Sequence, residues 1–538
     1  MTTTPERSGG EAAIDHDGIE PAVYQRRWKI LAVLCASLII VIVGNTVLNV
    51  ALPTLARPDG LGASNTELQW MVDAYALVFA GLLFTAGALG DRFGRKGALQ
   101  SGLVVFAIGS LIGAFAGSSG QVIAGRAIMG IGAAFIMPST LSILTNVFPG
   151  RERAKAIAIW AGISGAGAAI GPVTSGLLLE HYWWGSVFLI NLPIIAIASV
   201  AVWILVPKSK DATASPLDPV GAVLSLVGIS ALVYAIIEGP NHGWASAESL
   251  LWFTGAIGVL ALFAWWEWRS RHPMLDLRLF RNRRFSVASG GISLIFFAMF
   301  GMFYLLTQYL QFVLGYSPLE AALRLLPFPA LMMIVAPQTP RLVGRFGADR
   351  VASTGLAFIA VAFLLASQFD GDTPYWYLVI VVCILASGMA LTMSPMTTQL
   401  MSAVPRDRAG IGSAMNDTTR ELGGALGVAV LGSIVTSRYT SGLADAVSGL
   451  PEQVGEIAKG SVGGVRGLVE QGALPGEVAT RLLSAASDAF VDGLALATLV
   501  AAAVSAVAAV IVRVLLPSDR NNPEVAGDVS PEQAITVD

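Results

Sequence analysis

Long apolar stretches recur along almost the whole chain, and they constrain its fold more than any other feature. A helix needs about 20 apolar residues to cross the hydrocarbon core of a bilayer, and each stretch is about that long or longer. Only 13% of the 538 residues are charged, whereas soluble domains carry about a quarter. The sequence therefore predicts an all-α polytopic membrane protein. The fourteen predicted spans are 28–50, 68–90, 98–116, 121–147, 153–180, 186–206, 217–238, 249–268, 285–313, 319–345, 350–368, 375–400, 408–436 and 488–516.

Basic side chains identify the loops that we expect on the cytoplasmic side of the membrane. Lys and Arg are enriched in cytoplasmic loops, and this bias sets the orientation of the chain. Here they occur before the first span and in every second loop after it, whereas the alternate short loops contain only Arg57. Both termini are therefore predicted in the cytoplasm, as polar tails at 1–27 and 517–538, the first of them disordered. The long outer loop 437–487 does not alter this, because long loops cross largely regardless of charge.

A charged turn separates the second and third predicted spans. Four charged residues fall within six positions there, and glycines stand among them. Glycine allows helices to approach closely, and an acid in such a turn can cap a helix N-terminus or pair with a nearby Arg. Its charge pattern places the turn in the cytoplasm. The residues concerned are Gly87, Asp91, Arg92, Gly94, Arg95 and Lys96.

This turn resembles the loop-2/3 signature of the major facilitator superfamily, Gly-x-Leu-x-Asp-Arg-x-Gly-Arg-Lys, which it matches almost in full. Further motifs follow in order, and the whole set resembles the fourteen-span drug:proton antiporter family of that superfamily. The resemblance covers nearly the whole chain from 28 to 516. The further motifs are NTVLNVALP (Asn45–Pro53), RAIMGIGAAFIMPSTLS (Arg126–Ser142), GISGAGAAIGPVTSG (Gly162–Gly176), WWGSVFLINLP (Trp183–Pro193), PMLDLRLF (Pro273–Phe280), QYLQFVLGYSP (Gln308–Pro318) and RELGGALGVAVLG (Arg420–Gly432).

The resemblance implies the domain organisation and the transport cycle. We expect two six-helix bundles at 28–206 and 285–516, related by pseudo-symmetry, with two additional helices at 217–268 between them. Substrate would bind near the bilayer midplane between the bundles, and rocking of the bundles would expose it to each side in turn. The charged turn would act as a conformational latch, in which Asp91 and Arg95 stabilise the state open to the outside.

A glycine-rich run in the fifth predicted span matches the motif that marks exporters in this family. Small residues at short spacing let helices pack backbone to backbone, and a proline can kink a helix. The resemblance implies that the run seals the transporter at its outer side, and ordinary small-residue packing is the alternative. Ser175 stands where the family usually has a glycine. The motif residues are Gly167, Gly171, Pro172 and Gly176.

Charged residues inside the spans are candidates for proton coupling, because an unpaired charge at mid-membrane costs about 2.5–3.5 kcal/mol or more. Asp73 and Arg126 lie at matching depth, five residues from the outer ends of their spans, where they could pair. Asp417 and Glu421 are four residues apart and share one helix face. Two carboxylates so placed repel each other less if one of them stays protonated. A purely structural role for Asp73 with Arg126, and for Asp417 with Arg420, stays open.

One departure from the family bears on the substrate. The family usually has an Asp two residues before the Thr of the first span, and this chain has Gly44 there. The acid that many relatives offer to cationic drugs or protons is therefore missing, so strict dependence on dicationic substrates is less expected. Candidate substrate-binding residues are Asn45, Asn49, Tyr304, Gln308, Gln311 and Met389.

The sequence thus predicts a secondary active exporter in a bacterial inner membrane, which exchanges protons for lipophilic small molecules, cationic drugs among them. An exporter of an endogenous lipid or secondary metabolite and a non-transporting membrane sensor remain alternatives. We expect no enzyme activity, cofactor or metal site, because no nucleophile–base pair is visible and both cysteines lie in apolar spans. No basic patch with exposed aromatics suggests nucleic acid. The expected partners are protons, a lipophilic substrate and membrane lipids, and we expect a monomer.

Overall fold

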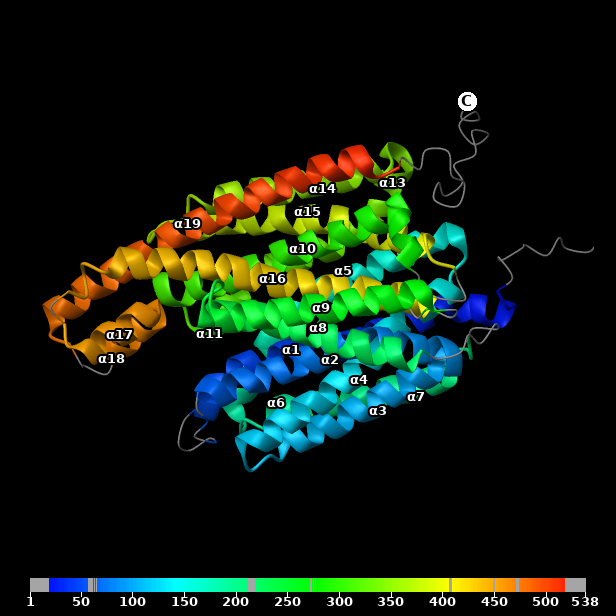
Figure 1. The fold of residues 1–538 in the computed structure, drawn as a ribbon, viewed down its shortest axis with the longest axis horizontal. Coiled ribbons are helices and arrows are strands. Elements are labelled where there is room, and N and C mark those ends of the chain that lie inside the picture. The colour runs from blue at the N-terminus through cyan, green and yellow to red at the C-terminus, as the bar shows by residue number, and fades with distance from the viewer. Residues whose placement is uncertain are drawn as a thin grey trace, which may run out of the picture.

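Every regular element of the described chain in the computed structural model is a helix (Figure 1). The structure describes residues 19–56, 61, 63, 65–210, 218–270, 273, 275, 277–405, 409–448, 450–470 and 474–517. Most of the two predicted tails, 1–18 and 518–538, lies outside the described residues. The first helix begins at Pro21, inside the predicted N-terminal tail.

The N-terminal group of helices comprises α1 to α7. The sixth predicted span is broken into a short helix and a longer one. Pro193 lies in the first turn of the longer helix, where proline is tolerated because its missing N–H would have no partner in the helix. The elements are α1 (Pro21–Ala56), α2 (Asn65–Phe93), α3 (Arg95–Ala114), α4 (Ser119–Val147), α5 (Gly150–His181), α6 (Ser186–Leu189) and α7 (Asn191–Leu205).

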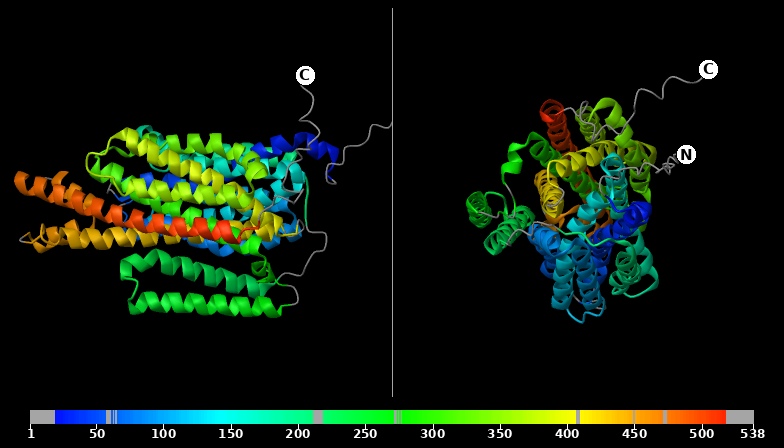
Figure 2. Two further views of the ribbon diagram at one scale, coloured as in Figure 1. Left: turned by 90° about the horizontal axis from the view of Figure 1, so that it is seen from above. Right: turned by 90° about the vertical axis from the view of Figure 1, so that its right-hand side faces the viewer.

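Two further helices, α8 (Pro219–His242) and α9 (Ala247–Arg269), form a hairpin at the side of the other helices (Figure 2). The inner helix α8 packs against α2, where the Ser230 hydroxyl donates a hydrogen bond to the Leu77 carbonyl at 3.2 Å. Large apolar side chains on α9 are exposed. We therefore expect α9 to face lipid.

The C-terminal group of helices comprises α10 to α19. Its second span, predicted at 319–345, is broken into several short helices because it contains four prolines, and each of the four pieces has a proline in its first turn. The elements are η1 (Leu277–Arg281), α10 (Arg283–Gln308), η2 (Tyr309–Val313), α11 (Pro318–Arg324), α12 (Pro327–Val335), η3 (Ala336–Gln338), α13 (Thr339–Phe346), α14 (Ala348–Ala366), α15 (Tyr375–Ser402), α16 (Ala409–Leu443), α17 (Glu452–Gly460), α18 (Val462–Glu470) and α19 (Gly476–Leu515).

The predicted fold class is confirmed, because each of the fourteen predicted spans coincides with helix. Thirteen helical spans in the described part of the chain are long and apolar enough to cross a membrane. The remaining predicted span is α5, a continuous helix of 32 residues.

The predicted outer loop 437–487 is largely helical. The helix α16 continues to Leu443 and α19 begins at Gly476, so both run farther than the predicted spans. The short helices α17 and α18 lie between them, and Figure 1 shows this part projecting beyond the other helices.

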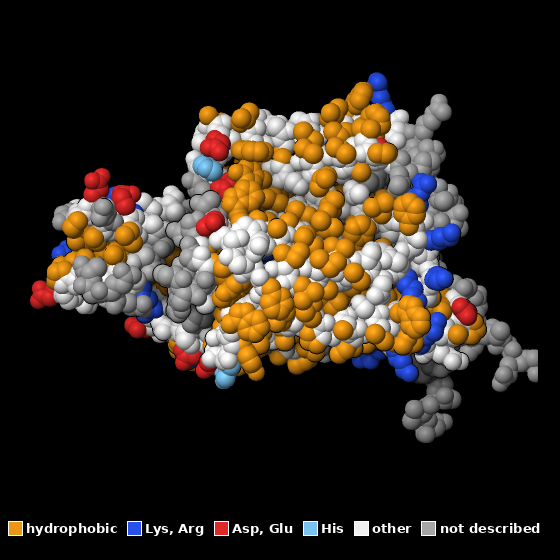
Figure 3. Space-filling view, turned by 90° about the horizontal axis from the view of Figure 1, so that it is seen from below, with side chains coloured by type: hydrophobic (Ala, Val, Ile, Leu, Met, Phe, Trp, Pro, Cys, Tyr) orange, Lys and Arg blue, Asp and Glu red, His pale blue; other side chains and the backbone are white. Residues whose placement is uncertain are grey.

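The two ends of the molecule differ in charge (Figure 3). Hydrophobic side chains cover a broad band across the middle of the face shown. Lys and Arg gather at the end where α1 begins and α19 ends, which we call the terminal end. Asp and Glu gather at the opposite end, around α17 and α18. An apolar band between two charged ends is the surface expected of a protein that crosses a bilayer.

Glycines let pairs of helices touch backbone to backbone in both groups. A Cβ on Gly102 of α3 would lie 2.8 Å from the Gly132 carbonyl oxygen of α4. In the C-terminal group, a Cβ on Gly388 of α15 would lie 2.6 Å from the Gly355 carbonyl oxygen of α14. Membrane helices associate through this kind of close packing, since lipid provides no hydrophobic driving force between them.

We predict that Gly132→Ala destabilises the protein, because the new methyl group would lie 2.6 Å from the backbone nitrogen of Phe106. Overpacking of this kind costs about 1–3 kcal/mol. The control is Gly120→Ala on the same helix, where no atom lies within 4 Å of the added methyl group. The fraction of monodisperse protein after a heating series measures the effect. Equal heat resistance of the two variants would contradict the proposed packing.

Candidate functional site

The charged turn between α2 and α3 joins the two groups of helices at the terminal end. The Asp91 carboxylate accepts a hydrogen bond from Arg95 Nε at 2.7 Å and another from the Gly410 backbone N–H at 2.7 Å. Gly410 lies in the first turn of α16, where free N–H groups and the helix dipole favour a negative charge. Asp91 and Arg95 are both buried. Asp91, one of the predicted latch residues, therefore forms a direct contact between the two groups of helices.

The other residues of this turn support the same contact. A Cβ on Gly87 would lie 2.7 Å from the Gly410 carbonyl oxygen, so only glycine lets α2 approach α16 this closely. The Lys96 ammonium donates to the Trp203 carbonyl of α7 at 2.7 Å. The Arg92 guanidinium lies over the neighbouring Phe93 ring. The turn is thus fixed to both α7 and α16.

A second turn, between α13 and α14, repeats the Arg-Phe-Gly sequence of the first. Gly94 and Gly347 end the two repeats with φ angles of 119° and 91°, a backbone region that favours glycine. In the second turn Asp349 lies in the first turn of α14 and pairs with Arg513 of α19 at 2.7 Å. This ion pair stays within the C-terminal group. Between these two turns, and among the described residues, it is the acid of the first that joins the two groups.

A buried polar cluster lies on α16. The Asp417 Oδ1 atom accepts a hydrogen bond from the Asn416 amide at 3.1 Å and lies 3.6 Å from Arg420 Nη1. The Asn416 amide oxygen in turn accepts from the Thr397 hydroxyl of α15 at 3.2 Å. Asp417 Oδ2 has no hydrogen-bond partner among the described residues. The Asp417–Arg420 pair that we considered as a structural alternative is therefore present, with one carboxylate oxygen still available.

This cluster also touches the N-terminal group. The Arg420 guanidinium lies over the Phe296 ring of α10 at 4.5 Å and over the Trp160 ring of α5 at 5.4 Å. The Trp160 indole N–H donates to the Thr140 hydroxyl of α4 at 3.3 Å. Arg420 is eleven residues from the start of α16, about 16 Å along the axis and so well inside the ~30 Å hydrocarbon core. The cluster is a charged layer between the two groups.

Glu421 lies beside this cluster and is half-buried. Its charge acts on Arg420, on Asp417 and on the Tyr75 hydroxyl of α2. The two carboxylates of α16 therefore lie within electrostatic range of each other, as their spacing of four residues predicts. Glu421 is the acid of this pair that is directed toward the N-terminal group.

The predicted pair between Asp73 and Arg126 is not formed. Arg126 is fully buried, and its guanidinium donates to the Met71 carbonyl at 2.9 Å and to the Gly44 carbonyl at 2.5 Å. It also lies over the Tyr75 ring at 4.4 Å. Carbonyl dipoles and an aromatic face thus stabilise the Arg126 charge in place of a carboxylate. Similar depth along two helices does not determine whether two side chains point toward each other, so it could not predict this partner.

Asp73 lies elsewhere on α2. It is half-buried and within electrostatic range of Tyr234 on α8. The face of α2 that carries Asp73 is therefore directed toward the hairpin α8–α9 rather than toward Arg126. The backbone carbonyl of Gly44, at the position where the family usually has its acid, is one of the two carbonyls that bind Arg126.

The glycine run of α5 makes close contacts on two sides. A Cβ on Gly167 would lie 3.1 Å from the nearest atom of α1, and Gly171 is packed still more tightly against Thr46 of the same helix. A Cβ on Gly176 would lie 3.6 Å from Leu319 of α11 in the C-terminal group. The side chain of Pro172 lies outside the described residues. The run therefore packs α5 against its own group and borders the other group.

The predicted substrate-binding residues have different surroundings. Met389 is fully buried in α15, whereas Tyr304 of α10 is 43% exposed. The backbone carbonyl of Gln311 in η2 accepts a hydrogen bond from the Arg466 guanidinium of α18. Asn45 and Gln308 are half-buried, and the Asn49 side chain lies outside the described residues.

Several participants in these contacts were not identified from the sequence. Asn416 stands next to Asp417, and a polar residue beside an acid within a span is a signal that could have found it. Trp160 and Thr397 are distant in sequence from α16, so their contacts depend on the fold. Gly410 contributes its backbone, through the N–H to Asp91 and the carbonyl against Gly87, which no side-chain pattern reveals.

Comparison with known proteins is consistent with this architecture. The family model described as Major Facilitator Superfamily matches residues 34–428. The chain is 38% identical to the multidrug efflux pump LfrA of Mycolicibacterium smegmatis, over 91% of this chain and 96% of the relative. It is 31% identical to the tetracenomycin C resistance and export protein of Streptomyces glaucescens, over 95% of each chain.

A solved structure shares the fold. It is a bacterial homologue of the human lysosomal transporter Spinster, in an inward-facing and unoccupied conformation, with a TM-score of 0.57. The alignment covers 92% of this chain and 98% of that one at 18% sequence identity, so the likeness concerns the fold alone.

We predict that Asp91→Asn loosens the contact between α2 and α16, because an amide loses the charge that Arg95 and the α16 N-terminus stabilise. Spin labels at the exposed positions Phe93 and Ser402 report the separation at the terminal end. The distance distribution should broaden toward longer values. Asp445→Asn, at an exposed position beyond α16, is the matched control. An unchanged distribution for Asp91→Asn would show that this carboxylate does not hold the two groups together.

Proposed function

Because the chain belongs to the major facilitator superfamily, a family of transporters, we propose that it is a secondary active exporter that exchanges protons for lipophilic small molecules, cationic drugs among them. The resistance and export activities named for two relatives support this proposal. The observation that carries it is the buried layer of charge on α16 between the two groups of helices. Maintaining Asp417, Arg420 and Glu421 there is costly, so their presence points to a functional role.

In this proposal Asp417 and Glu421 bind the transported proton. Asp417 keeps one oxygen without a hydrogen-bond partner in the described chain, and Glu421 is half-buried beside it. Arg420 interacts with both acids and stabilises their ionised forms. A proton that binds either acid weakens its attraction to Arg420, which leaves the guanidinium on the Trp160 and Phe296 rings. A cationic substrate would compete with the proton for the same negative charge.

The contact at the terminal end supports alternating access as the transport cycle. Asp91 joins α2 to the start of α16, and the Gly87 backbone lies against the same turn. We propose that these contacts close the terminal end while substrate leaves at the opposite end. The two groups of helices would then rock about the charged layer. A single chain contains both groups, so we propose that it works as a monomer.

The distribution of charge supports a location in a bacterial inner membrane with both termini in the cytoplasm. Lys and Arg gather at the terminal end, and Asp and Glu gather at the opposite end (Figure 3). Basic residues favour the cytoplasmic side. The helices α17 and α18 would then lie outside the cell.

Export of an endogenous secondary metabolite is the second candidate. The relative from Streptomyces glaucescens is named for export of tetracenomycin C, and the match spans 95% of this chain. Gly44 at the position of the family acid also fits a neutral cargo better than a dication. Transport of ethidium compared with that of a neutral aromatic polyketide, in the same proteoliposomes, distinguishes the two candidates.

We predict that Glu421→Gln retains substrate binding at high pH but loses gradient-driven export by about tenfold or more, because an amide cannot bind and release the proton. Asp417→Asn should also lose export, and it should destabilise the protein, since Arg420 then has a neutral neighbour. Proteoliposomes with an imposed pH gradient and ethidium as cargo provide the measurement. The matched control is Glu477→Gln on the exposed start of α19, which should transport normally. Coupled export by both α16 variants would refute proton antiport through these acids.

We predict that single cysteines at Phe93, the last residue of α2, and Gly97, in the first turn of α3, react with an impermeant thiol reagent only from the cytoplasmic side, because both positions are exposed. A cysteine at Glu456 of α17 should react from outside intact cells, because α17 lies at the opposite end. Each is introduced into a chain that lacks the two native cysteines. Labelling of the turn in intact cells would invert the proposed topology.

A further inference from the structure

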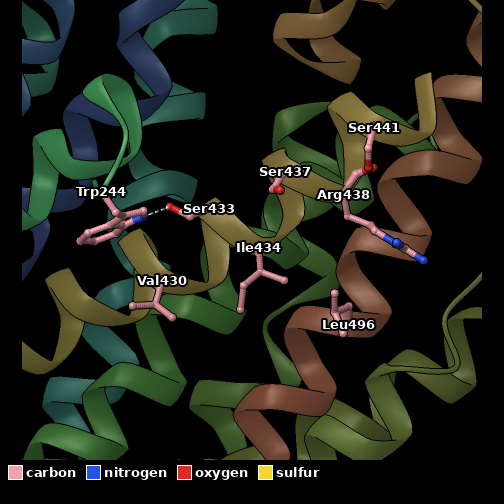
Figure 4. A pocket seen from close by; sticks show the side chains of 8 residues that line it. All are labelled: Trp244, Val430, Ser433, Ile434, Ser437, Arg438, Ser441 and Leu496. Atoms are coloured by element: carbon pink, nitrogen blue, oxygen red, sulfur yellow. Dashed lines mark hydrogen bonds between the residues drawn. The ribbon is translucent and has the colours of Figure 1, made fainter. Parts of the chain in front are cut away.

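A groove lies at the side of the molecule between the tip of the hairpin α8–α9, α16 and α19 (Figure 4). Its volume is about 570 Å³, which is within the range of sites that hold small ligands. The proton-coupling proposal uses none of its residues. They are Trp244, Val430, Ser433, Ile434, Ser437, Arg438, Ser441 and Leu496.

Trp244 forms the wall of the groove on the hairpin side. Its indole N–H donates a hydrogen bond to the Ser433 hydroxyl of α16 at 2.7 Å, and its ring stacks on Phe253 of α9 with the centroids 5.9 Å apart. Both contacts fix the ring between the hairpin and α16. The groove therefore exists in this form only while the tip of the hairpin is docked on α16.

The lining changes from apolar to polar along α16. Val430 and Ile434 follow one another at a spacing of one turn, and Leu496 of α19 lies across from Ile434 (Figure 4). The next turns of α16 carry Arg438 and Ser441 in the same groove. An apolar part that continues into a basic and hydroxylated part matches a ligand with an apolar chain and an anionic head.

The polar part lies at the depth of lipid headgroups. Gly410 marks the terminal end of α16, and Arg438 follows it by 438 − 410 = 28 residues. This is about 42 Å along a helix, whereas a bilayer with both headgroup layers is about 40–45 Å thick. Ile434 is one turn deeper, at the edge of the hydrocarbon core. Trp244 at this level is also typical, because tryptophan concentrates at membrane interfaces.

The charge of Arg438 is available for an anion. Its side chain is exposed, and no carboxylate pairs with its guanidinium in the described part of the chain. Arginine presents several N–H donors in a planar fork and binds phosphate oxygens in pairs. The neighbouring Ser441 hydroxyl donates to the Arg438 carbonyl, so its oxygen can still accept a hydrogen bond from a headgroup hydroxyl.

We propose that this groove is a binding site for one anionic phospholipid of the leaflet at the opposite end. Its phosphate would bind Arg438, and one acyl chain would lie over Ile434, Val430 and Leu496. The bound lipid would fill the space between the hairpin and the C-terminal group and so hold Trp244 against α16. This role is independent of the transported substrate, and its test does not depend on export.

Native mass spectrometry of the purified full-length protein tests the proposal, with palmitoyl-oleoyl phosphatidylglycerol and the zwitterionic phosphatidylcholine of the same chains as probes. The protein should bind one phosphatidylglycerol more tightly than any phosphatidylcholine. Arg438→Gln should lower this affinity about tenfold, since a charge-assisted hydrogen bond is lost. Arg438→Lys should keep most of it. The matched control Arg481→Gln removes an exposed positive charge from α19 outside the groove and should bind as the parent protein does.

A second variant, Leu496→Trp, fills the apolar part without changing the charge and should also lose the tightly bound lipid. It provides the test if Arg438→Gln does not yield monodisperse protein. The proposal is overturned by equal binding of the two lipids, by parent-like affinity in Arg438→Gln, or by retention of the lipid in Leu496→Trp. An equal loss in Arg481→Gln would overturn it as well, because surface charge alone would then explain the binding.

Discussion

The free-energy cost of burying charge and unpaired backbone groups in a bilayer determines how this chain is built. The backbone forms helices throughout the described spans, because lipid provides no hydrogen-bond partners. The few interior charges have specific partners. Arg126 donates to two backbone carbonyls, and Asp91 accepts from the first turn of a helix. The charges that remain close to the centre, on α16, are the ones to which a function can be assigned.

The helix α16 connects the two parts of the proposed mechanism. Gly410 in its first turn binds Asp91, and the carboxylate of Asp417 lies seven residues farther along the same helix, about 10 Å away. A rigid helix transmits a shift at one point to the other with little loss. Protonation of Asp417 or Glu421 would therefore bear directly on the contact that closes the terminal end. The ring of Trp160 over Arg420 adds a second contact with the N-terminal group at the level of the charged layer.

The sequence predicted what periodicity and local motifs determine. Apolar stretches of spanning length predicted all fourteen helices. The turn at 91–96 indicated a latch, and its Asp91 does contact the other group of helices, while the latch function stays a prediction. The partner of Arg126 could not be predicted, because equal depth on two helices leaves their rotation undetermined, and Asp73 is directed toward α8. Trp160 and Gly410 could not be predicted either, since both act across the interface between the two groups. Prolines in the sixth and tenth spans mark the places where these helices break. The apolar pattern alone predicts each of them as one continuous span.

The central claim is that the carboxylates of α16 exchange a proton for the substrate. Proton release on ligand binding tests it most directly, with the detergent-solubilised protein in weakly buffered solution, a pH-indicator dye and ethidium as the ligand. Near neutral pH the parent protein should release up to about one proton per ligand bound. In the double variant Asp417→Asn, Glu421→Gln, ethidium should bind more weakly because the negative charge is lost, and the ethidium that does bind should release no proton. Undiminished proton release by that double variant would contradict the account.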